Sequence, residues 1–228
     1  MNARPYVILS CAVSLDGYID DATDTRLVLS NNADLDRVDA MRADCDAILV
    51  GAGTVRRDDP GLLVRSSQRR AARTSAGGPE NPVKVTLTAT GDLDPAARFF
   101  TTGNGEKLVY CAGPALASIS RLRAAATIVD AGDPLDLTVL LADLAARGVR
   151  RLLVEGGSAV HTGFLAASLA DEVCLAIAPF LVGDPMAPRF VRAGTFPQSP
   201  GDPMRLTEVR QLGDVAVLRY LTGGAVDE

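Results

Sequence analysis

Short apolar runs of strand length alternate with stretches of helical pattern along this chain, and this alternation restricts its fold more than any other feature. Helical patterns begin at Asn32 and cover residues 135–147 and 159–170. Runs that are apolar throughout are typical of strands buried on both faces, and strands separated by helices form a largely parallel sheet. The strand-like runs are residues 6–13, 47–50, 83–88, 107–111, 127–129, 151–154 and 173–178.

Two further runs, residues 206–212 and 215–221, flank a turn signal at Gly213-Asp214 and predict an antiparallel hairpin. We therefore expect an α/β protein whose mixed, mostly parallel central sheet is flanked by helices and ends in a C-terminal antiparallel hairpin. No internal repeat or linker separates two cores, so residues 1–228 are predicted to form a single domain. One flexible loop is expected at about residues 67–82, which are rich in Ser, Arg, Gly and Pro.

Composition limits the partners and the location of the protein. The chain carries 28 acidic and 23 basic residues, and this net charge of −5 disfavours nucleic acid and anionic membranes as partners. No run approaches the roughly 18 apolar residues of a membrane span. Four scattered cysteines and a single histidine offer no metal-site spacing and indicate buried thiols in the reducing cytoplasm. We interpret that histidine, His161, as a packed or surface residue of a helix.

Ligands of open α/β sheets bind beyond the carboxyl ends of strands, and three strand ends in this chain are unusual. They are residues 14–17, 51–60 and 155–159. At the third, the doublet Gly156-Gly157 lets the backbone approach a ligand, and the N–H groups of Gly157, Ser158 and Ala159 could form an anion site. A glycine-rich turn with Ser158 as an ordinary N-cap explains the same residues equally well, so both interpretations stay open.

The second strand end is no dinucleotide fingerprint, because an arginine replaces its third glycine and no acidic residue follows about 20 positions later. Residues 56–73 nevertheless hold six arginines and two aspartates in a chain of net negative charge. A basic stretch beside glycine-rich strand ends suits a small anionic ligand such as a phosphate ester. We favour a ligand role for Arg65 and a solvated loop for the last three arginines, Arg69, Arg70 and Arg73.

Carboxylates at strand ends are the candidates for proton handling or substrate orientation, namely Asp16, Asp58 and Glu155. Asp16 also suits ordinary turn chemistry, because it precedes a glycine. A Ser-His-Asp triad has no support beyond composition. Carboxylates with phosphate-binding signals and no metal ligands are consistent with a nicotinamide-dependent reductase, in which the cofactor carries the difficult step.

The strand-end residues also form an ordered set of short motifs. The set comprises Ser14-Leu15-Asp16-Gly17, Arg42-Ala43 with Asp46 to Gly51, Thr54-Val55 with Asp58-Asp59-Pro60, Leu62 and Arg65, Leu153 to Gly157, and Ile177-Ala178-Pro179 with Leu181-Val182-Gly183. In this order, over essentially the whole chain, it resembles the pyrimidine reductase of riboflavin biosynthesis, which is the reductase domain of the bifunctional deaminase-reductase. The resemblance implies a dihydrofolate-reductase-like fold, NADPH as cofactor and a homodimer.

The resemblance further implies the reaction and the residues that serve it. The reaction reduces a phosphoribosylamino-pyrimidine of the 5-amino-6-(5-phosphoribosylamino)uracil type, by hydride transfer to the sugar C1′ of a ring-opened imine, and yields the ribityl side chain. Asp58 and Glu155 are the implied catalytic residues, which orient and polarise. The implied cofactor contacts are Ala12, Thr54, Asp58, Thr88, Thr90, Gly157, Ser158, Ala159, Val160, His161, Thr162 and Gly163. The implied substrate contacts are Arg42, Leu62, Arg65 and Glu155, with Arg26 added for a differently placed anion.

Three departures from the family pattern keep alternatives open. Ser10 stands where bacterial bifunctional members usually carry Lys, and Arg26 and Val28 stand where they tend to have Ser and Trp. The H-x-E and P-C-x-x-C signatures of the zinc deaminase are absent, so no deaminase domain is expected. One alternative is an NADPH-dependent reductase of another pterin-like, pyrimidine-like or specialised-metabolite substrate. The other, a non-catalytic nucleotide-binding relic, is disfavoured because the site residues are retained together.

Overall fold

The computed structural model describes residues 4–23, 25 and 27–223, and it divides the chain into two compact units. Unit 1 comprises Met1–Tyr6 and Asp39–Leu153, and unit 2 comprises Val7–Val38 and Val154–Glu228. Helix α1 (Asn32–Asp44) contributes residues to both. Because each unit draws on two separate stretches of the chain, the division follows no linker, and the single domain stays a prediction.

Unit 1 contains strands in the order β5-β4-β3-β2-β6. Within it, β2 pairs with β3, β3 with β4 and β4 with β5, and each pair is parallel. All five residues of β2 and four of the five in β4 are buried, as their continuous apolar sequences predict. The strands are β2 (Ala47–Gly51), β3 (Val83–Thr88), β4 (Lys107–Cys111), β5 (Thr127–Asp130) and β6 (Arg151–Val154).

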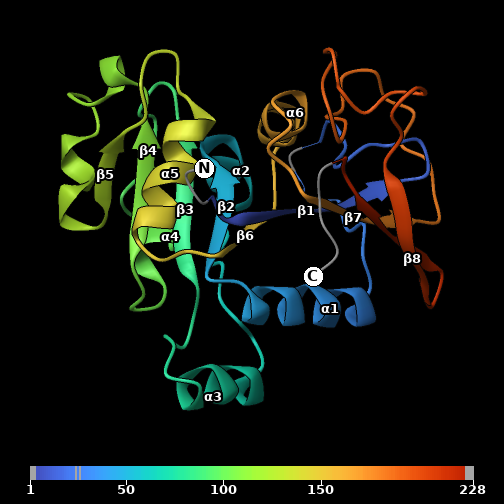
Figure 1. Ribbon diagram of the computed structural model, residues 1–228, viewed down its shortest axis with the longest axis horizontal. Helices are drawn as coiled ribbons and strands as arrows, with labels where there is room; N and C mark the ends of the chain where they lie inside the picture. The colour runs from blue at the N-terminus through green and yellow to red at the C-terminus, as the bar shows by residue number, and fades with distance from the viewer. Residues whose placement is uncertain (1–3, 24, 26, 224–228) are drawn as a thin grey trace. The chain divides into compact units, whose positions relative to one another are not determined.

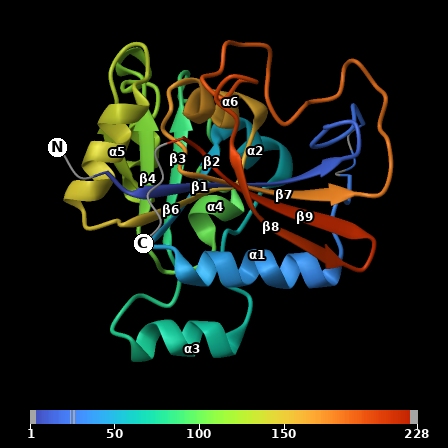
Figure 2. The ribbon, with the colours of Figure 1, turned by 45° about the vertical axis from the view of Figure 1, so that its right-hand side comes forward.

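Helices of unit 1 accompany these strands, and α5 lies alongside β4 in both views (Figures 1 and 2). The Tyr110 hydroxyl of β4 donates a hydrogen bond of 2.6 Å to Asp143 of α5, and Leu140, Leu141 and Leu144 of α5 are buried. The helices are α2 (Ala52–Asp58), α3 (Ser67–Ser75), α4 (Arg98–Thr101) and α5 (Leu137–Ala146), with short 3₁₀ turns at Gly113–Ala115 and Ser120–Ala124.

The flexible loop predicted at about residues 67–82 is wrong for its first half, which forms helix α3. Ser66 caps this helix by accepting a hydrogen bond from the backbone N–H of Arg69. None of its residues is buried, so it has no apolar stripe that the sequence could reveal. The second half of the predicted loop follows the end of α3, where Gly77 adopts a positive φ of 83°.

Unit 2 contains strands in the order β1-β7-β9-β8, which lie next to one another in Figure 2. β1 pairs in parallel with β7, whereas β7–β9 and β8–β9 are antiparallel. The predicted C-terminal hairpin is therefore confirmed, with Gly213 at a φ of 62° in its turn. The elements are β1 (Tyr6–Ser14), β7 (Glu172–Ala178), β8 (Arg205–Leu212), β9 (Val215–Leu221) and helix α6 (Ser158–Ala166). The fold class is thus the predicted α/β arrangement, with a mostly parallel sheet and a terminal hairpin.

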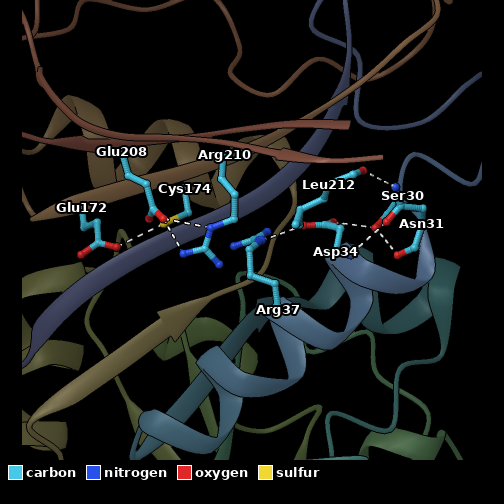
Figure 3. Close-up of polar contacts among 9 residues, drawn as sticks. All are labelled: Ser30, Asn31, Asp34, Arg37, Glu172, Cys174, Glu208, Arg210 and Leu212. Carbon is cyan, nitrogen blue, oxygen red and sulfur yellow. Dashed lines mark hydrogen bonds and ion pairs between the residues drawn. The ribbon is translucent and has the colours of Figure 1, made fainter. Parts of the chain in front are cut away.

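The first turns of α1 join the hairpin through polar contacts, which Figure 3 shows. The side chain of Asn31 donates to the carbonyl of Leu212 at 2.6 Å. Asp34 accepts from Ser30 and, at 2.7 Å, from Arg37. These contacts fix the start of α1 beside the turn of the hairpin. Among the described residues, no helix is long and apolar enough to cross a membrane.

Candidate active site

In unit 2, the chain passes from β6 into α6 through two glycines that require conformations most residues avoid. Gly156 has a φ of 139° and Gly157 a φ of 88°. Gly157 is the N-cap of α6, and within the described residues no side chain caps this helix. The alternative in which Ser158 is an ordinary N-cap is therefore wrong, because its hydroxyl donates to the carbonyl of Arg189 instead. An uncapped helix start behind two flexible glycines fits an anionic group of a ligand.

The side chains of α6 that follow pack against the segment 189–192 of the same unit. Thr162 accepts from the backbone N–H of Arg192 at 2.9 Å. The His161 ring lies 5.0 Å from the Phe190 ring and is fully buried, as the packed interpretation predicts. Neither of its ring nitrogens has a hydrogen-bond partner among the residues that the structure describes, and burial lowers its pKa to about 4. The side chains of His161 and Thr162 are thus packed within the unit, whereas the first backbone N–H groups of α6 have no side-chain cap among the described residues.

The other predicted site residues of unit 2 lie on β1, just after β6 and on α6. Glu155 follows β6 and is half-buried. Ala12 of β1 packs against the apolar cluster of Ala176, Val215 and Val217. Val160 is buried, Ala159 is exposed and Gly163 is half-buried. Arg26 lies outside the described residues.

Asp16 ties together the two loops that follow β1 and β7. Its carboxylate accepts from the hydroxyl of Ser14 at 2.6 Å and from the N–H groups of Val182 and Gly183. The Ser14 hydrogen bond is the largest effect on the pKa of Asp16 and lowers it, desolvation opposes it, and the two backbone N–H groups lower the pKa further. Asp16 therefore has the turn role that its sequence context favours.

In unit 1, a strained loop follows helix α2. Thr54 and Asp58 lie on α2 and are both half-buried. Asp59 ends the helix with a φ of 40°, and Leu62 has a φ of 47° although it is buried. This left-handed backbone costs a residue with a side chain about 1–2 kcal/mol, so the surroundings must hold it in place. Such strain concentrates at functional sites, and Leu62 was assigned to the substrate.

Hydrogen bonds from several elements hold residues 59–66, which we name the 59–66 loop. Asp59 accepts from the N–H of Arg98 at 2.6 Å, and Thr102 donates to the carbonyl of Gly61 at 3.3 Å. The N–H of Val64 donates to Asn81 at 2.8 Å. Arg42 of α1 donates to the carbonyl of Leu63 at 3.1 Å, and Asp39, one helical turn earlier, accepts from the N–H groups of Arg65 and Ser66. The structure thus brings Arg42, Leu62 and Arg65 together.

The arginines around this loop differ in what their guanidinium groups bind. Arg69 pairs with Asp39 at 2.9 Å, and Arg70 donates to the carbonyls of Val64 and Arg65. Arg73 donates to three backbone carbonyls, two of which close the end of α1. The solvated-loop interpretation of these three is wrong, because each is bound to the protein. Arg65 is exposed, and within the described chain its guanidinium makes no hydrogen bond or ion pair.

The two threonines after β3 differ in exposure. Thr88 is buried, and its hydroxyl accepts from the N–H of Gly91 at 2.9 Å. Thr90 is exposed, and its hydroxyl accepts from the N–H of Asp92 at 3.4 Å. Thr90 is therefore the better placed of the two to meet a ligand. Asp39 and Asn81, which hold the 59–66 loop, were not identified from the sequence. The only signal was the three-residue spacing of Asp39 and Arg42, which places both on one helix face.

The comparisons with known proteins cover nearly the whole chain. Residues 5–218 match the family described as the RibD C-terminal domain. The 2,5-diamino-6-ribosylamino-4(3H)-pyrimidinone 5′-phosphate reductase of Methanothermobacter thermautotrophicus is 35% identical over 224 residues, which cover 97% of this chain and 100% of that protein. The reductase of the same name from Archaeoglobus fulgidus is 32% identical over 215 residues, with 92% and 95% covered.

Solved structures agree with these sequence matches. The diaminohydroxyphosphoribosylaminopyrimidine deaminase/5-amino-6-(5-phosphoribosylamino)uracil reductase of Thermotoga maritima has a TM-score of 0.78 at 25% identity, with 96% of this chain and 57% of that chain covered. A pyrimidine reductase-like protein of Corynebacterium diphtheriae has a TM-score of 0.80 at 20% identity, with 95% and 91% covered, and shares the fold. The chain belongs to the RibD C-terminal domain family.

Proposed function

We propose that this protein is an NADPH-dependent reductase of riboflavin biosynthesis, which reduces the ribosyl side chain of a phosphoribosylamino-pyrimidine to ribityl. The observation that carries the proposal is the match to two reductases of this name along almost their full length. Both are named for the 2,5-diamino-pyrimidinone phosphate, so we take this compound as the primary substrate and the deaminated uracil compound as the second.

The residues described above fit such a pair of ligands. NADPH supplies the hydride when it is bound. The N–H groups at the start of α6, which no side chain of the described residues caps, suit its phosphates, and the flexible backbone of Gly156 and Gly157 permits close approach. Thr54 and Thr90 are further proposed contacts of the cofactor.

On the substrate side, Arg65 would bind the phosphate, because its guanidinium is exposed and its backbone is fixed. Arg42 and Leu62 would complete this contact. Asp58 and Glu155 would orient and polarise the substrate, because hydride transfer depends chiefly on holding the two reacting carbons about 3–3.5 Å apart. The scattered, unpaired cysteines suit the cytoplasm, where thiols stay reduced.

The experiment that tests the proposal follows NADPH oxidation by absorbance, with each of the two pyrimidine phosphates supplied in turn. Turnover with either compound, fastest with the diamino compound, is expected. NADPH should also raise the melting temperature more than NADH does. The absence of turnover with both compounds would refute the proposal, and turnover of a pterin instead would favour the alternative substrate class.

A homodimer is part of the proposal, and strand β8 supports it. β8 ends the strand order of unit 2, and its apolar side chains Leu206 and Val209 are 48% and 65% exposed. An antiparallel pairing of β8 with its own copy, centred on Val209, would set Glu208 opposite Arg210 of the second copy. Such opposite charges stabilise a strand pair. Light scattering during size-exclusion chromatography should give twice the monomer mass for the unmodified protein. The Val209→Lys variant should elute with the mass of a monomer.

A further inference from the structure

A buried carboxylate lies beneath the backbone that carries Arg65. Asp39 of α1 is 4% exposed, and its two oxygens accept hydrogen bonds from three donors. Oδ1 accepts from the N–H of Arg65, while Oδ2 accepts from the N–H of Ser66 at 3.1 Å and from the guanidinium of Arg69 at 2.9 Å. A single side chain therefore fixes two consecutive peptide groups of the 59–66 loop and occupies a neighbouring arginine.

Asp39 is unsuited to meet an anionic substrate itself. Its negative charge would repel a phosphate, and both of its oxygens already accept hydrogen bonds from the protein. Burial alone would raise the pKa of Asp39, but the hydrogen bonds from Arg65, Arg69 and Ser66 outweigh it and lower that pKa, so the carboxylate is ionised at neutral pH. An effect of Asp39 on the substrate must therefore act through the residues that it holds.

We infer that Asp39 is a positioning residue for substrate binding, which holds the 59–66 loop so that the guanidinium of Arg65 meets the substrate phosphate. The inference rests on the proposed function. It assigns to the phosphate site a residue that lies outside the short motifs named in the sequence analysis. Arg69 pairs with Asp39 at 2.9 Å, so the guanidinium that balances the charge of Asp39 is that of Arg69 rather than that of Arg65.

The neighbouring contacts act in the same direction. Arg42, three residues further along α1, binds the carbonyl of Leu63, and Asn81 binds the N–H of Val64. Side chains thus hold four successive residues of the loop, immediately after Leu62 in its strained conformation. A backbone fixed in this way reduces the entropy cost of phosphate binding, because only the Arg65 side chain remains to be ordered.

The test compares Asp39→Asn with Asp34→Asn as a matched control. Asp34 lies on the same helix, is 1% exposed and is bound by Arg37, but its hydrogen bonds are to Ser30 and Arg37 rather than to the 59–66 loop (Figure 3). For each protein we would measure kcat, the KM of the pyrimidine phosphate, the KM of NADPH, the inhibition constant of inorganic phosphate and the melting temperature.

Asp39→Asn should raise the KM of the pyrimidine phosphate and the inhibition constant of phosphate about tenfold, while kcat changes less than about threefold and the KM of NADPH stays constant. Tenfold corresponds to the loss of about one well-formed hydrogen bond. Asp34→Asn should lower the melting temperature without changing either KM. A role in folding alone predicts instead that the two variants behave alike.

A second variant keeps the inference testable if Asp39→Asn does not fold. Asn81 is half-buried and holds the loop from the other side, so Asn81→Ala should raise the same two constants and leave the KM of NADPH unchanged. The inference is overturned if both loop variants match Asp34→Asn, or if the KM of NADPH rises in parallel. Absence of turnover in the unmodified protein would instead refute the proposed function, and this inference with it.

Discussion

The only histidine of the chain should make the stability of this protein depend on pH in a way that a single substitution removes. His161 is fully buried, its ring nitrogens have no partner in the described part of the chain, and burial lowers its pKa from 6.5 to about 4. Between these two values the unfolded chain binds a proton that the folded chain rejects, so acid favours unfolding. This destabilising contribution of His161 is absent above about pH 7 and grows as the pH falls through 6.5 towards 4.

The size of this effect follows from the two pKa values. At about pH 5 the histidine should lower the free energy of unfolding by about 2 kcal/mol, and at about pH 4 by about 3 kcal/mol. The pKa values of four aspartates are also lowered in the folded protein, so these residues lose stabilising energy as the pH falls. Most of that loss occurs below about pH 5, because an unfolded aspartate titrates near 3.8. The four are Asp16, Asp39, Asp136 and Asp143. His161→Leu should abolish the loss between about pH 7.5 and about pH 5, because leucine has similar volume and no proton to bind.

Urea unfolding at these two pH values, followed by circular dichroism, measures the difference. The unmodified protein should lose about 2 kcal/mol more than His161→Leu on acidification. Val160→Ala, at a buried position of the same helix, is the control and should lose stability equally at both pH values. If the unmodified protein and His161→Leu lose the same amount, then His161 is accessible to protons in the folded state and the reasoning fails.

Two further substitutions test the polar contacts of each unit. Glu172 is 3% exposed and accepts two hydrogen bonds from Arg219, at 2.8 and 2.7 Å. Arg219→Met should therefore lower the free energy of unfolding in urea by about 2 kcal/mol. An unchanged urea midpoint would show that solvent screens the pair. Tyr110→Phe removes the hydroxyl that donates to Asp143 at 2.6 Å and should lower stability by about 1 kcal/mol in thermal unfolding. A loss above about 3 kcal/mol would mean that the ring itself repacks.

The parallel strands were predictable because a strand buried on both faces has an uninterrupted run of apolar residues, as β2 does. The hairpin, whose strand β8 is largely exposed, was located instead by the turn signal at Gly213-Asp214, and the turn before α6 by its glycine doublet. Helix α3 was missed because its arginines bind carbonyls elsewhere in the chain, whereas a sequence window sees only polar residues. Asp39 was missed for a related reason. Its partners lie 26 to 30 positions away, and no local pattern records a contact of that kind.

The distribution of arginines around the 59–66 loop bears on how salt should act on this protein. Three arginines of helix α3 bind carbonyls and carboxylates of the chain, namely Arg69, Arg70 and Arg73. Added salt would therefore weaken the contacts by which they stabilise the fold, and not contacts with a ligand. A substrate phosphate would meet the charge of Arg65 without theirs. Affinity for the pyrimidine phosphate should therefore fall only gently with ionic strength, far less steeply than the number of arginines in this stretch suggests.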